Sequence, residues 1–354
     1  MRYLDFGTVS AEQSQAVYHA VAEELRPGDP ITLITVSPDR PYVCVGYHQA
    51  ASREIDRAYC EEQGVPVGRR MVGGGAVYLD HDQIFWHLVM PGGAPPVQAF
   101  YDRLLSAPVG AYRDIGIQAE HRPVNDIVVG PRKIGGTGAA SIGQANVLVG
   151  SIMMDFDTKA MARVLRVPSE KFRDKLISSL DDYMTTIRRE LGDGAPTRET
   201  ATARLVSRFS EVLGERVEAS ALSPGERERL DHYAQILFDP EFVYRQEGWL
   251  QPGVKLKDGV RLYEGVHKAP GGLLRFIYRD REGVFDDVLL SGDFFVDPPD
   301  ALQRIARSLL GRPASEEVLR LLLEEGLAHA AMPGVGEEDF LQAFRAAKAI
   351  EATV

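Results

Sequence analysis

Two glycine-rich segments, each next to runs of β-branched residues, restrict most strongly what this chain can fold into. The first reads RRMVGGGAVYLD over 69–80, and the second reads NDIVVGPRKIGGTGAA over 125–140. Glycine permits left-handed backbone, while the flanking runs are typical of strands. We therefore interpret both segments as strands on either side of a glycine loop.

The first 245 residues mix strands and helices. Ser10 and Gln13 predict a capped helix start, and Gly64 predicts a helix end. We expect helices over 11–25, 52–64 and 100–116, strands over 31–36, 42–46, 65–70, 76–79, 83–90, 125–130, 132–136 and 146–156, and mainly helix over 158–240.

The pattern changes after FDPEF (238–242). Polar and apolar residues alternate over 259–295, with turn signals at 268–272 and 280–283, which predicts a β-meander. Helices are expected near 299–310, 315–326 and 336–348. The sequence thus predicts an α+β protein with a first domain over 1–245 and a smaller second domain over 246–354.

Composition limits the function. The chain has 354 residues and a formal net charge of −11, whereas a general nucleic-acid binder needs clustered positive charge. Two cysteines form no disulfide framework, so a reducing compartment is expected. The N-terminal ten residues do not resemble a signal peptide, and no apolar run is long enough for a membrane span. We expect a cytoplasmic protein that binds neither nucleic acid nor membrane.

The glycines and their cationic neighbours can bind an anion. Bare backbone allows N–H groups to converge on a negative charge, and Arg69 and Arg70 add forked donors. Lys133 would face the same pocket. The alternatives are a tight turn with solvated arginines and an ordinary surface lysine. GTGAASIG (136–143) is not a dinucleotide fingerprint, because strand character resumes almost at once.

Together and in this order, the two segments resemble motifs of the lipoate–protein ligase A family, within the biotin/lipoate A/B protein ligase superfamily. VGYHQ (45–49), VGSIMMDFD (149–157) and SGDFF (291–295) are similar to further parts of the larger ligases. The motif positions in the two segments are Arg69, Arg70, Gly73, Gly74, Gly75 and Val77, and then Asn125, Asp126, Lys133, Ile134 and Gly136.

The resemblance implies a mixed sheet flanked by helices, as in biotin/lipoyl synthetases, with a small α+β C-terminal domain. It also implies an ATP-dependent reaction in which lipoate becomes lipoyl-AMP. The lipoyl group then passes to a lysine of an acceptor protein, either a lipoyl domain or a glycine-cleavage H-like protein.

The resemblance also implies residue roles. Lys133 would be catalytic, at the carboxylate and α-phosphate where negative charge builds. Asp126 would lie near a nucleotide-bound Mg²⁺. The positions expected to bind substrate or nucleotide are Arg70, Gly73, Gly74, Gly75, Ala76, Val77, Asn125, Asp126, Gly136, Ser151, Val45, Gly46 and His48.

Some positions depart from the family pattern. Val72 stands where the family often has Ser, and Leu79 and Val149 stand where it often has His. An octanoyl or lipoyl transferase of the same superfamily is one alternative, and a non-catalytic lipoyl-binding homologue is another. A transferase with a cysteine nucleophile needs a cysteine just before the lysine block, where this chain reads EHRPVNDI.

Overall fold

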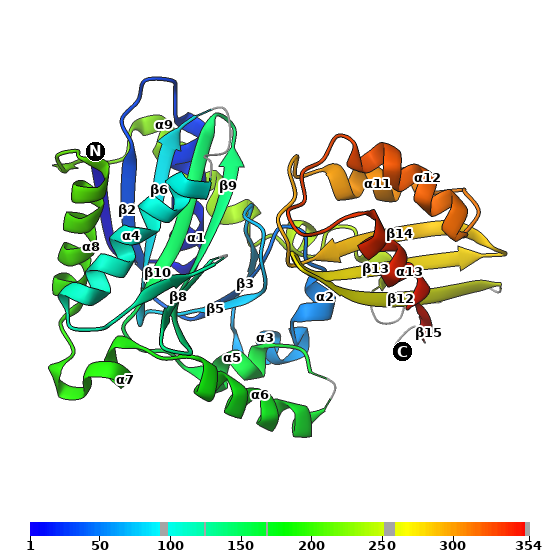
Figure 1. Cartoon of the computed structure of the whole chain (residues 1–354), viewed down its shortest axis with the longest axis horizontal. Helices are drawn as coiled ribbons and strands as arrows, with labels where there is room; N and C mark the ends of the chain where they lie inside the picture. Colours follow the sequence, from blue (N-terminus) through cyan, green and yellow to red (C-terminus); the bar gives the residue numbers. More distant parts are fainter. Residues whose placement is uncertain (93–97, 124, 168, 251–258, 351–354) are drawn as a thin grey trace. The chain divides into compact units, whose positions relative to one another are not determined.

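The computed structural model describes residues 1–92, 98–123, 125–167, 169–250 and 259–350. The chain divides into two compact units, which Figure 1 draws from blue at the N-terminus to red at the C-terminus. Unit 1 comprises Met1–Cys44, Asp56–Val72 and Val77–Asp239, and unit 2 comprises Val45–Ile55, Gly73–Ala76 and Pro240–Val354. Two short segments of the N-terminal region are therefore grouped with the C-terminal unit.

An eight-stranded mixed sheet forms the centre of unit 1, in the order β11-β1-β2-β6-β10-β9-β8-β7. β1 is parallel to both of its neighbours, and the remaining neighbours in this sheet are antiparallel to each other. The strands are β1 Arg2–Val9, β2 Thr32–Pro38, β6 Gln83–Pro91, β7 Glu120–Arg122, β8 Asp126–Val129, β9 Arg132–Ile142, β10 Ala145–Met153 and β11 Glu218–Ala219. A small second sheet joins β4 Val67–Arg69, β3 Tyr42–Val45 and β5 Val77–Leu79.

Helices cover both faces of the large sheet. Neighbouring residues of a strand point to opposite faces, so Trp86 packs on Phe209 of α8 while His87 packs on Tyr18 of α1. α4 lies beside α8, and α9 lies beside α1. The helices of unit 1 are α1 Ala11–Glu24, α3 Arg57–Gln63, α4 Gln98–Asp114, α5 Thr158–Val164, α6 Glu170–Tyr183, α7 Ile187–Leu191, η1 Gly192–Gly194, α8 Arg198–Leu213 and α9 Pro224–Ile236.

Unit 2 is a four-stranded antiparallel sheet in the order β14-β13-β12-β15, with helices packed on one face around Phe276, Phe285 and Phe340. Its strands are β12 Val260–Ala269, β13 Gly272–Arg281, β14 Val284–Gly292 and β15 Lys348–Ile350. Its helices are α2 Ala51–Glu54, α10 Pro240–Val243, η2 Gly248–Leu250, α11 Ala301–Leu309, α12 Glu316–Leu327 and α13 Glu337–Arg345.

The α+β class, the flanked mixed sheet and the meander are confirmed. Ser10 accepts a hydrogen bond from the N–H of Gln13, and Gly64 ends α3 in the left-handed region. The single helix expected over 52–64 is wrong, because Ile55 is extended and the side chain of Asp56 caps a new helix. The strand over Arg2–Val9 was not expected.

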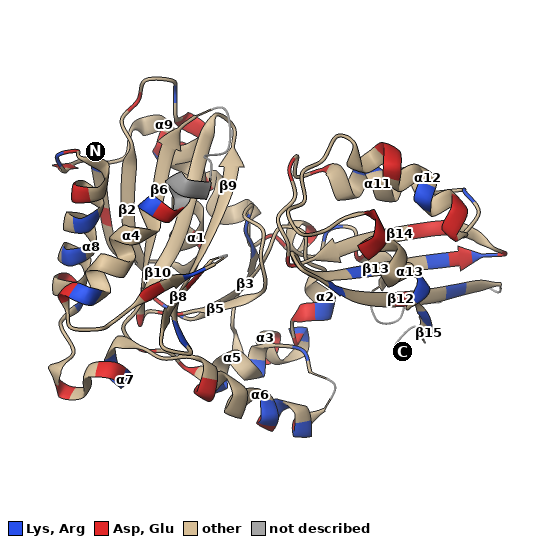
Figure 2. Cartoon of the chain, in the orientation of Figure 1, with Lys and Arg blue, Asp and Glu red and all other residues tan. Residues whose placement is uncertain are grey.

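The surface helices carry charges of both signs. Figure 2 shows Lys and Arg interspersed with Asp and Glu along α6 and α8, so neither helix presents a face of one sign. In the part of the chain that the structure describes, no helix combines the length and the apolar character needed to cross a membrane.

Candidate functional site

Lys133 lies on the β8–β9 hairpin, where a bulge sets its direction. Val128 pairs with Lys133 and Ile127 pairs with Gly135, so Ile134 is an additional residue in β9. Such bulges re-aim side chains. The Lys133 side chain runs beside Gly136, where a Cβ atom would lie 3.2 Å from its Cε and Nζ. Gly136 therefore leaves space for the lysine side chain.

The glycines after Lys133 do not form the expected loop. β9 continues from Arg132 to Ile142, and its residues 137–142 pair with β10. The missing Cβ atoms serve close packing: one on Gly135 would lie 3.1 Å from the carbonyl oxygen of Ser151 on β10. The expectation of a second glycine loop is wrong because strand pairing satisfies this backbone.

Asp126 is the centre of an ionic cluster. Its Oδ1 lies 2.7 Å from Lys133 Nζ. Its Oδ2 accepts hydrogen bonds from Arg122 Nη2 at 2.7 Å and from the Tyr183 hydroxyl at 2.9 Å. Arg122 also donates to the Tyr183 oxygen at 2.8 Å. We call these four residues the Asp126 cluster.

The cluster keeps Asp126 ionised. Partial burial would raise the pKa of Asp126, but Lys133, Arg122 and Tyr183 outweigh it and hold that pKa below its usual range. The pKa of Tyr183 is raised, first by desolvation and then by its hydrogen bond to the Asp126 carboxylate. Lys133 thus faces a fixed negative charge.

Asn125 is joined to Thr137 on the neighbouring strand. The carbonyl oxygen of Asn125 accepts from the Thr137 N–H at 2.9 Å, and the Asn125 amide donates to the Thr137 carbonyl at 3.2 Å. The structure therefore brings Asn125, Asp126, Lys133 and Gly136 together on one hairpin of unit 1.

The two arginines of the first motif occupy different environments. Arg69 is 1% exposed, whereas Arg70 is only partly buried and donates to the carbonyl oxygen of Cys44 at 3.1 Å. Arg70 is thus better suited than Arg69 to bind a ligand.

The glycine loop and the VGYHQ segment meet within unit 2. A Cβ atom on Gly46 would lie 1.9 Å from the carbonyl oxygen of Gly74, so only glycine fits there. Gly74 also has a φ of 94°. Gly73 approaches the backbone of Phe294, and the carbonyl oxygen of His48 accepts from the N–H of Gly292 at 3.0 Å. Val45 is fully buried.

Charged groups of unit 2 fix the rest of this segment. The carboxylate of Glu247 accepts from the N–H groups of Ala51 and Ser52 at 2.8 and 2.9 Å, which caps α2. Arg245 donates to the carbonyl oxygen of Tyr47 at 2.7 Å and lies 3.7 Å from the centre of its ring. Ala76, Val77 and Ser151 are partly buried, with Val77 and Ser151 on β5 and β10 of unit 1.

Two of the residues that depart from the family pattern lie together. Val149 pairs with Gly138 across β10 and β9. A Cβ atom on Gly138 would lie 3.2 Å from Val72 Cγ1 and 3.4 Å from Val149 Cγ2. Val72 and Val149 therefore form one apolar surface over Gly138.

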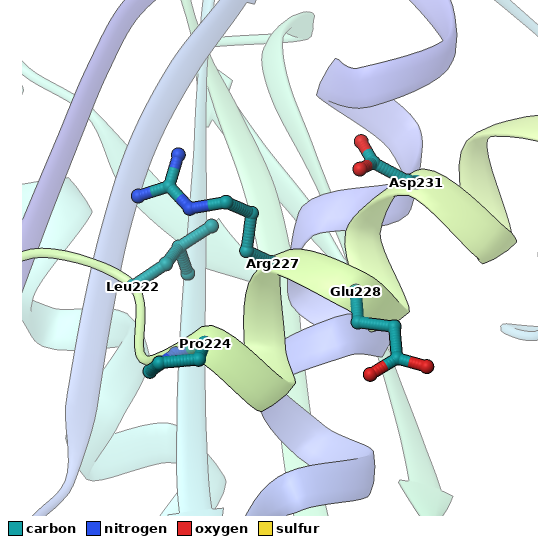
Figure 3. Close-up of a pocket in the computed structure, with 5 residues that line it drawn as sticks. All are labelled: Leu222, Pro224, Arg227, Glu228 and Asp231. Atoms are coloured by element: carbon teal, nitrogen blue, oxygen red, sulfur yellow. The ribbon is translucent and has the colours of Figure 1, made fainter.

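A cavity of about 450 Å³ lies elsewhere, at the start of α9 (Figure 3). Its lining residues all come from α9 and the turn before it, namely Leu222, Pro224, Arg227, Glu228 and Asp231. None of them is a predicted site residue, and the side chains of Arg227, Glu228 and Asp231 mix both charge signs. This cavity therefore contributes nothing to the candidate site.

A known protein family matches the part of the chain that holds these residues. The model of the lipoyl protein ligase A/B catalytic domain matches residues 10–210, more than half of the chain. The chain belongs to this family. The matched region contains the Asp126 cluster and Arg70.

The relatives of this ligase family member include both a transferase and a ligase. Octanoyltransferase LipM of Kyrpidia tusciae is 29% identical over 69% of this chain and 98% of its own length. Lipoate-protein ligase LplJ of Bacillus subtilis is 24% identical over 86% of this chain and 88% of its own length. Membership therefore makes the protein an acyl-transferring enzyme.

A solved structure shows the same fold. It is the bi-partite lipoate protein ligase of Thermoplasma acidophilum, described together with its E2 lipoyl domain. Its TM-score is 0.63 at 24% identity, and the match covers 73% of this chain and 98% of that chain.

Both oxygens of the Asp126 carboxylate already have partners within this family member. Lys133 engages one oxygen of Asp126, and Arg122 and Tyr183 engage the other. In the described residues, no group of three or more His, Cys, Asp or Glu side chains could hold a metal ion. The predicted position of Asp126 near a nucleotide-bound Mg²⁺ is a different kind of contact, because the nucleotide would carry the ion, and it stays a prediction.

Sequence reasoning missed two members of the Asp126 cluster. Arg122 precedes Asp126 by four positions on the facing strand of a hairpin, a spacing that could have indicated a cross-strand ion pair. Tyr183 comes from the end of α6, 57 positions from Asp126, and no local pattern marks it.

Proposed function

We propose that this protein is an ATP-dependent lipoate–protein ligase, which activates lipoate as lipoyl-AMP and transfers the lipoyl group to a lysine of an acceptor protein. The observation that carries the proposal is the partly buried Lys133 ammonium, held 2.7 Å from Asp126 beside the Arg122 guanidinium. The two cations around the Asp126 carboxylate leave a net positive charge where the carboxylate of lipoate and a phosphate of ATP would react.

The chemistry requires activation. A free carboxylate does not acylate an amine, because its leaving group would be oxide. In adenylation, a carboxylate oxygen of lipoate attacks the α-phosphorus of ATP and pyrophosphate leaves with the electron pair of the broken P–O bond. In transfer, the neutral acceptor amine attacks the acyl carbon, AMP leaves, and the amine loses a proton. Both steps concentrate negative charge that Lys133 would stabilise.

The other predicted residues receive binding roles in this proposal. Arg70 and the backbone N–H groups of Gly73, Gly74, Gly75, Ala76 and Val77 would hold phosphates. Asn125 and Asp126 would lie beside the nucleotide, and Gly136 would leave space for Lys133. Val45, Gly46, His48 and Ser151 would contact the acyl substrate.

The cysteines favour the ligase over a cysteine-dependent transferase. Both are buried, Cys44 fully and Cys60 at 1% exposed. Burial raises the pKa of Cys44, and burial with Asp56 and Glu61 raises the pKa of Cys60 to about 11. Neither thiol suits a nucleophile, which acts as the thiolate.

The C-terminal region favours the same choice. The match with the ligase LplJ extends over 306 residues, whereas the match with LipM takes in 98% of that transferase over only 273 residues. We propose that residues 1–245 carry the chemistry and that residues 246–354 form an accessory domain. The acceptor would be a lipoyl domain, as for the Thermoplasma ligase, or a glycine-cleavage H-like protein.

Pyrophosphate release tests the proposal. Purified protein is given ATP as its magnesium salt, with and without lipoate, and Lys133→Ala is compared with Lys171→Ala, an exposed lysine on α6. We expect lipoate-dependent release that Lys133→Ala abolishes and Lys171→Ala preserves. Octanoyl transfer from an acyl carrier protein without ATP would instead assign the transferase, and inactivity in both assays would assign a binding protein.

A further inference from the structure

Lys133 is held from two sides by one short segment. Tyr183, the last residue of α6, donates its hydroxyl hydrogen to Asp126, the side-chain partner of Lys133. Two residues later, the N–H of Thr185 donates to the carbonyl oxygen of Lys133 at 2.8 Å. The segment that follows α6 thus fixes the backbone of Lys133, while Tyr183 fixes the carboxylate that receives its ammonium.

Arg122 completes this arrangement from β7, the strand that pairs with β8. It donates to both Asp126 Oδ2 and the Tyr183 oxygen, and its guanidinium carbon lies 5.6 Å from the Tyr183 ring centre. Asp126 Oδ2 therefore has two donors, which leaves Oδ1 for Lys133. A carboxylate held at one oxygen by two donors cannot rotate without losing both.

We propose that Arg122 and Tyr183 are positioning residues that orient Lys133 through Asp126. The inference rests on the proposed function, because it assigns them to the step in which Lys133 stabilises developing negative charge. Neither residue is placed in contact with substrate.

Arg122 has an additional electrostatic effect. Asp126 carries one negative charge, and Lys133 and Arg122 carry one positive charge each, so the three together are net positive. Without Arg122, Asp126 and Lys133 form a neutral pair, and the negative charge that develops in the transition state is stabilised less. The Arg122 side chain is 40% exposed, so solvent screens part of this effect.

A matched control for Arg122 is present on β9, the strand that carries Lys133. Arg132 of β9 donates to Glu190 of α7 at 2.8 Å, and its side chain is 42% exposed. It resembles Arg122 in chemistry, exposure and ion-pair length, but its partner Glu190 accepts from Arg132 and from the Thr185 hydroxyl rather than from the Lys133 ammonium. Arg132→Gln therefore measures the loss of an ion pair near the site without loss of the Asp126 cluster.

Steady-state kinetics of lipoate-dependent pyrophosphate release test the inference. Arg122→Gln and Tyr183→Phe should each lower kcat by about tenfold, the usual effect of one lost hydrogen bond to a charged group. The KM values for ATP and lipoate should stay within about twofold, because the two residues do not bind substrate. Arg122→Lys should restore part of kcat, and Arg132→Gln should match wild type.

An equal loss of kcat in Arg122→Gln and Arg132→Gln would overturn the inference, as would a change in KM with kcat unaltered. A second measurement does not depend on activity. Lys133 is labelled with an amine-reactive ester and quantified by mass spectrometry against Lys171 in the same sample. Release of the ammonium from Asp126 should increase labelling of Lys133 in Arg122→Gln and Tyr183→Phe but not in Arg132→Gln.

The two measurements separate the inference from the proposed function. If wild type neither releases pyrophosphate nor transfers octanoate, the proposed function fails, and a selective rise in Lys133 labelling still shows that Arg122 and Tyr183 position this lysine. If wild type is active and the labelling of Lys133 is the same in all variants, the positioning inference fails and the ligase stands.

Discussion

The Asp126 cluster and a pair of histidines, His19 on α1 and His87 on β6, show two opposite environments for ionisable groups in unit 1. In the cluster, both oxygens of Asp126 accept hydrogen bonds or ion pairs. His19 is fully buried and His87 is 5% exposed. Among the described residues, both ring nitrogens of His19 and the Nδ1 of His87 have no hydrogen-bond partner. Their rings instead pack against Tyr18, with centres 4.1 and 4.7 Å away.

The two environments have opposite effects on charge. The cluster lowers the pKa of Asp126, which keeps the carboxylate charged. Desolvation lowers the pKa of His19 and of His87 to about 3, which keeps both imidazoles neutral, and His87 adds a smaller repulsion on His19. The charged groups of the cluster are therefore suited to a catalytic role, whereas the neutral histidines of α1 and β6 serve as aromatic packing.

The largest expected effect is the loss of stability on acidification. The folded pKa of each histidine lies below the unfolded value, so the unfolded state binds the proton first. Stability is full above the unfolded pKa of 6.5 and falls as the pH drops towards 3. Between about pH 7.5 and about pH 5 the two histidines should together cost about 4 kcal/mol.

Urea unfolding of the Trp249→Phe variant measures this loss, since its fluorescence then reports on Trp86 in unit 1. His19→Leu should remove about half of the histidine contribution, about 2 kcal/mol. His232→Leu, which replaces an exposed histidine of α9, is the control for loss of an imidazole. If the free energy of unfolding falls equally with pH in His19→Leu and in this control, His19 is protonated equally in the folded and unfolded states.

The next effect is on catalysis. Asp126→Asn keeps the shape of the side chain and removes the charge that fixes Lys133, so we expect kcat to fall about 100-fold. Glu190→Gln is the matched control, because the Glu190 and Asp126 side chains are each 17% exposed and each pairs with an arginine. Pyrophosphate release measures both, and equal losses would mean that Asp126 has only a structural role.

Local sequence signals predicted those parts of the fold and site that depend on short-range chemistry. Gly64 ends a helix and Ser10 begins one because each acts within one turn. The hairpin that carries Asn125, Asp126 and Lys133 was visible in the order of its residues. The break between two helices at Ile55 was not predicted, because the alternation of apolar and polar residues continues through Ile55. Asp56 is nevertheless a good N-cap residue.

Long-range contacts decided the remainder. Residues 137–142 have the composition of a loop, but β10 supplies the pairing that makes them a strand. Tyr183 reaches Asp126 because the next two residues are held against β9: Met184 forms a β-bridge with Lys133, and Thr185 donates its N–H to the Lys133 carbonyl. Arg69 and Arg70 are identical in type and adjacent, yet only the fold shows that the first is buried and the second borders Cys44. Such differences depend on neighbours that are distant in the sequence.

The smallest effect concerns Asp80, whose environment lies between the two extremes. It is 4% exposed and accepts hydrogen bonds from the N–H of Asp82 and the amide of Gln83 at 3.1 and 3.3 Å. Burial outweighs these bonds and raises the pKa of Asp80 to about 6. The folded pKa lies above the unfolded value of 3.8, so stability is full at low pH and is lost as the pH rises through about 6.

Asp80→Asn keeps an oxygen for both hydrogen bonds and removes the charge. The stability advantage of the variant over wild type should grow by about 1.4 kcal/mol between about pH 5 and about pH 7.5. This pH dependence is opposite to that of His19→Leu, whose advantage grows as the pH falls. Urea unfolding followed by Trp86 fluorescence measures both variants. A gain for Asp80→Asn that does not change with pH would show that the carboxylate is already neutral or fully compensated, and Asp80 would then belong with the Asp126 cluster as a satisfied group.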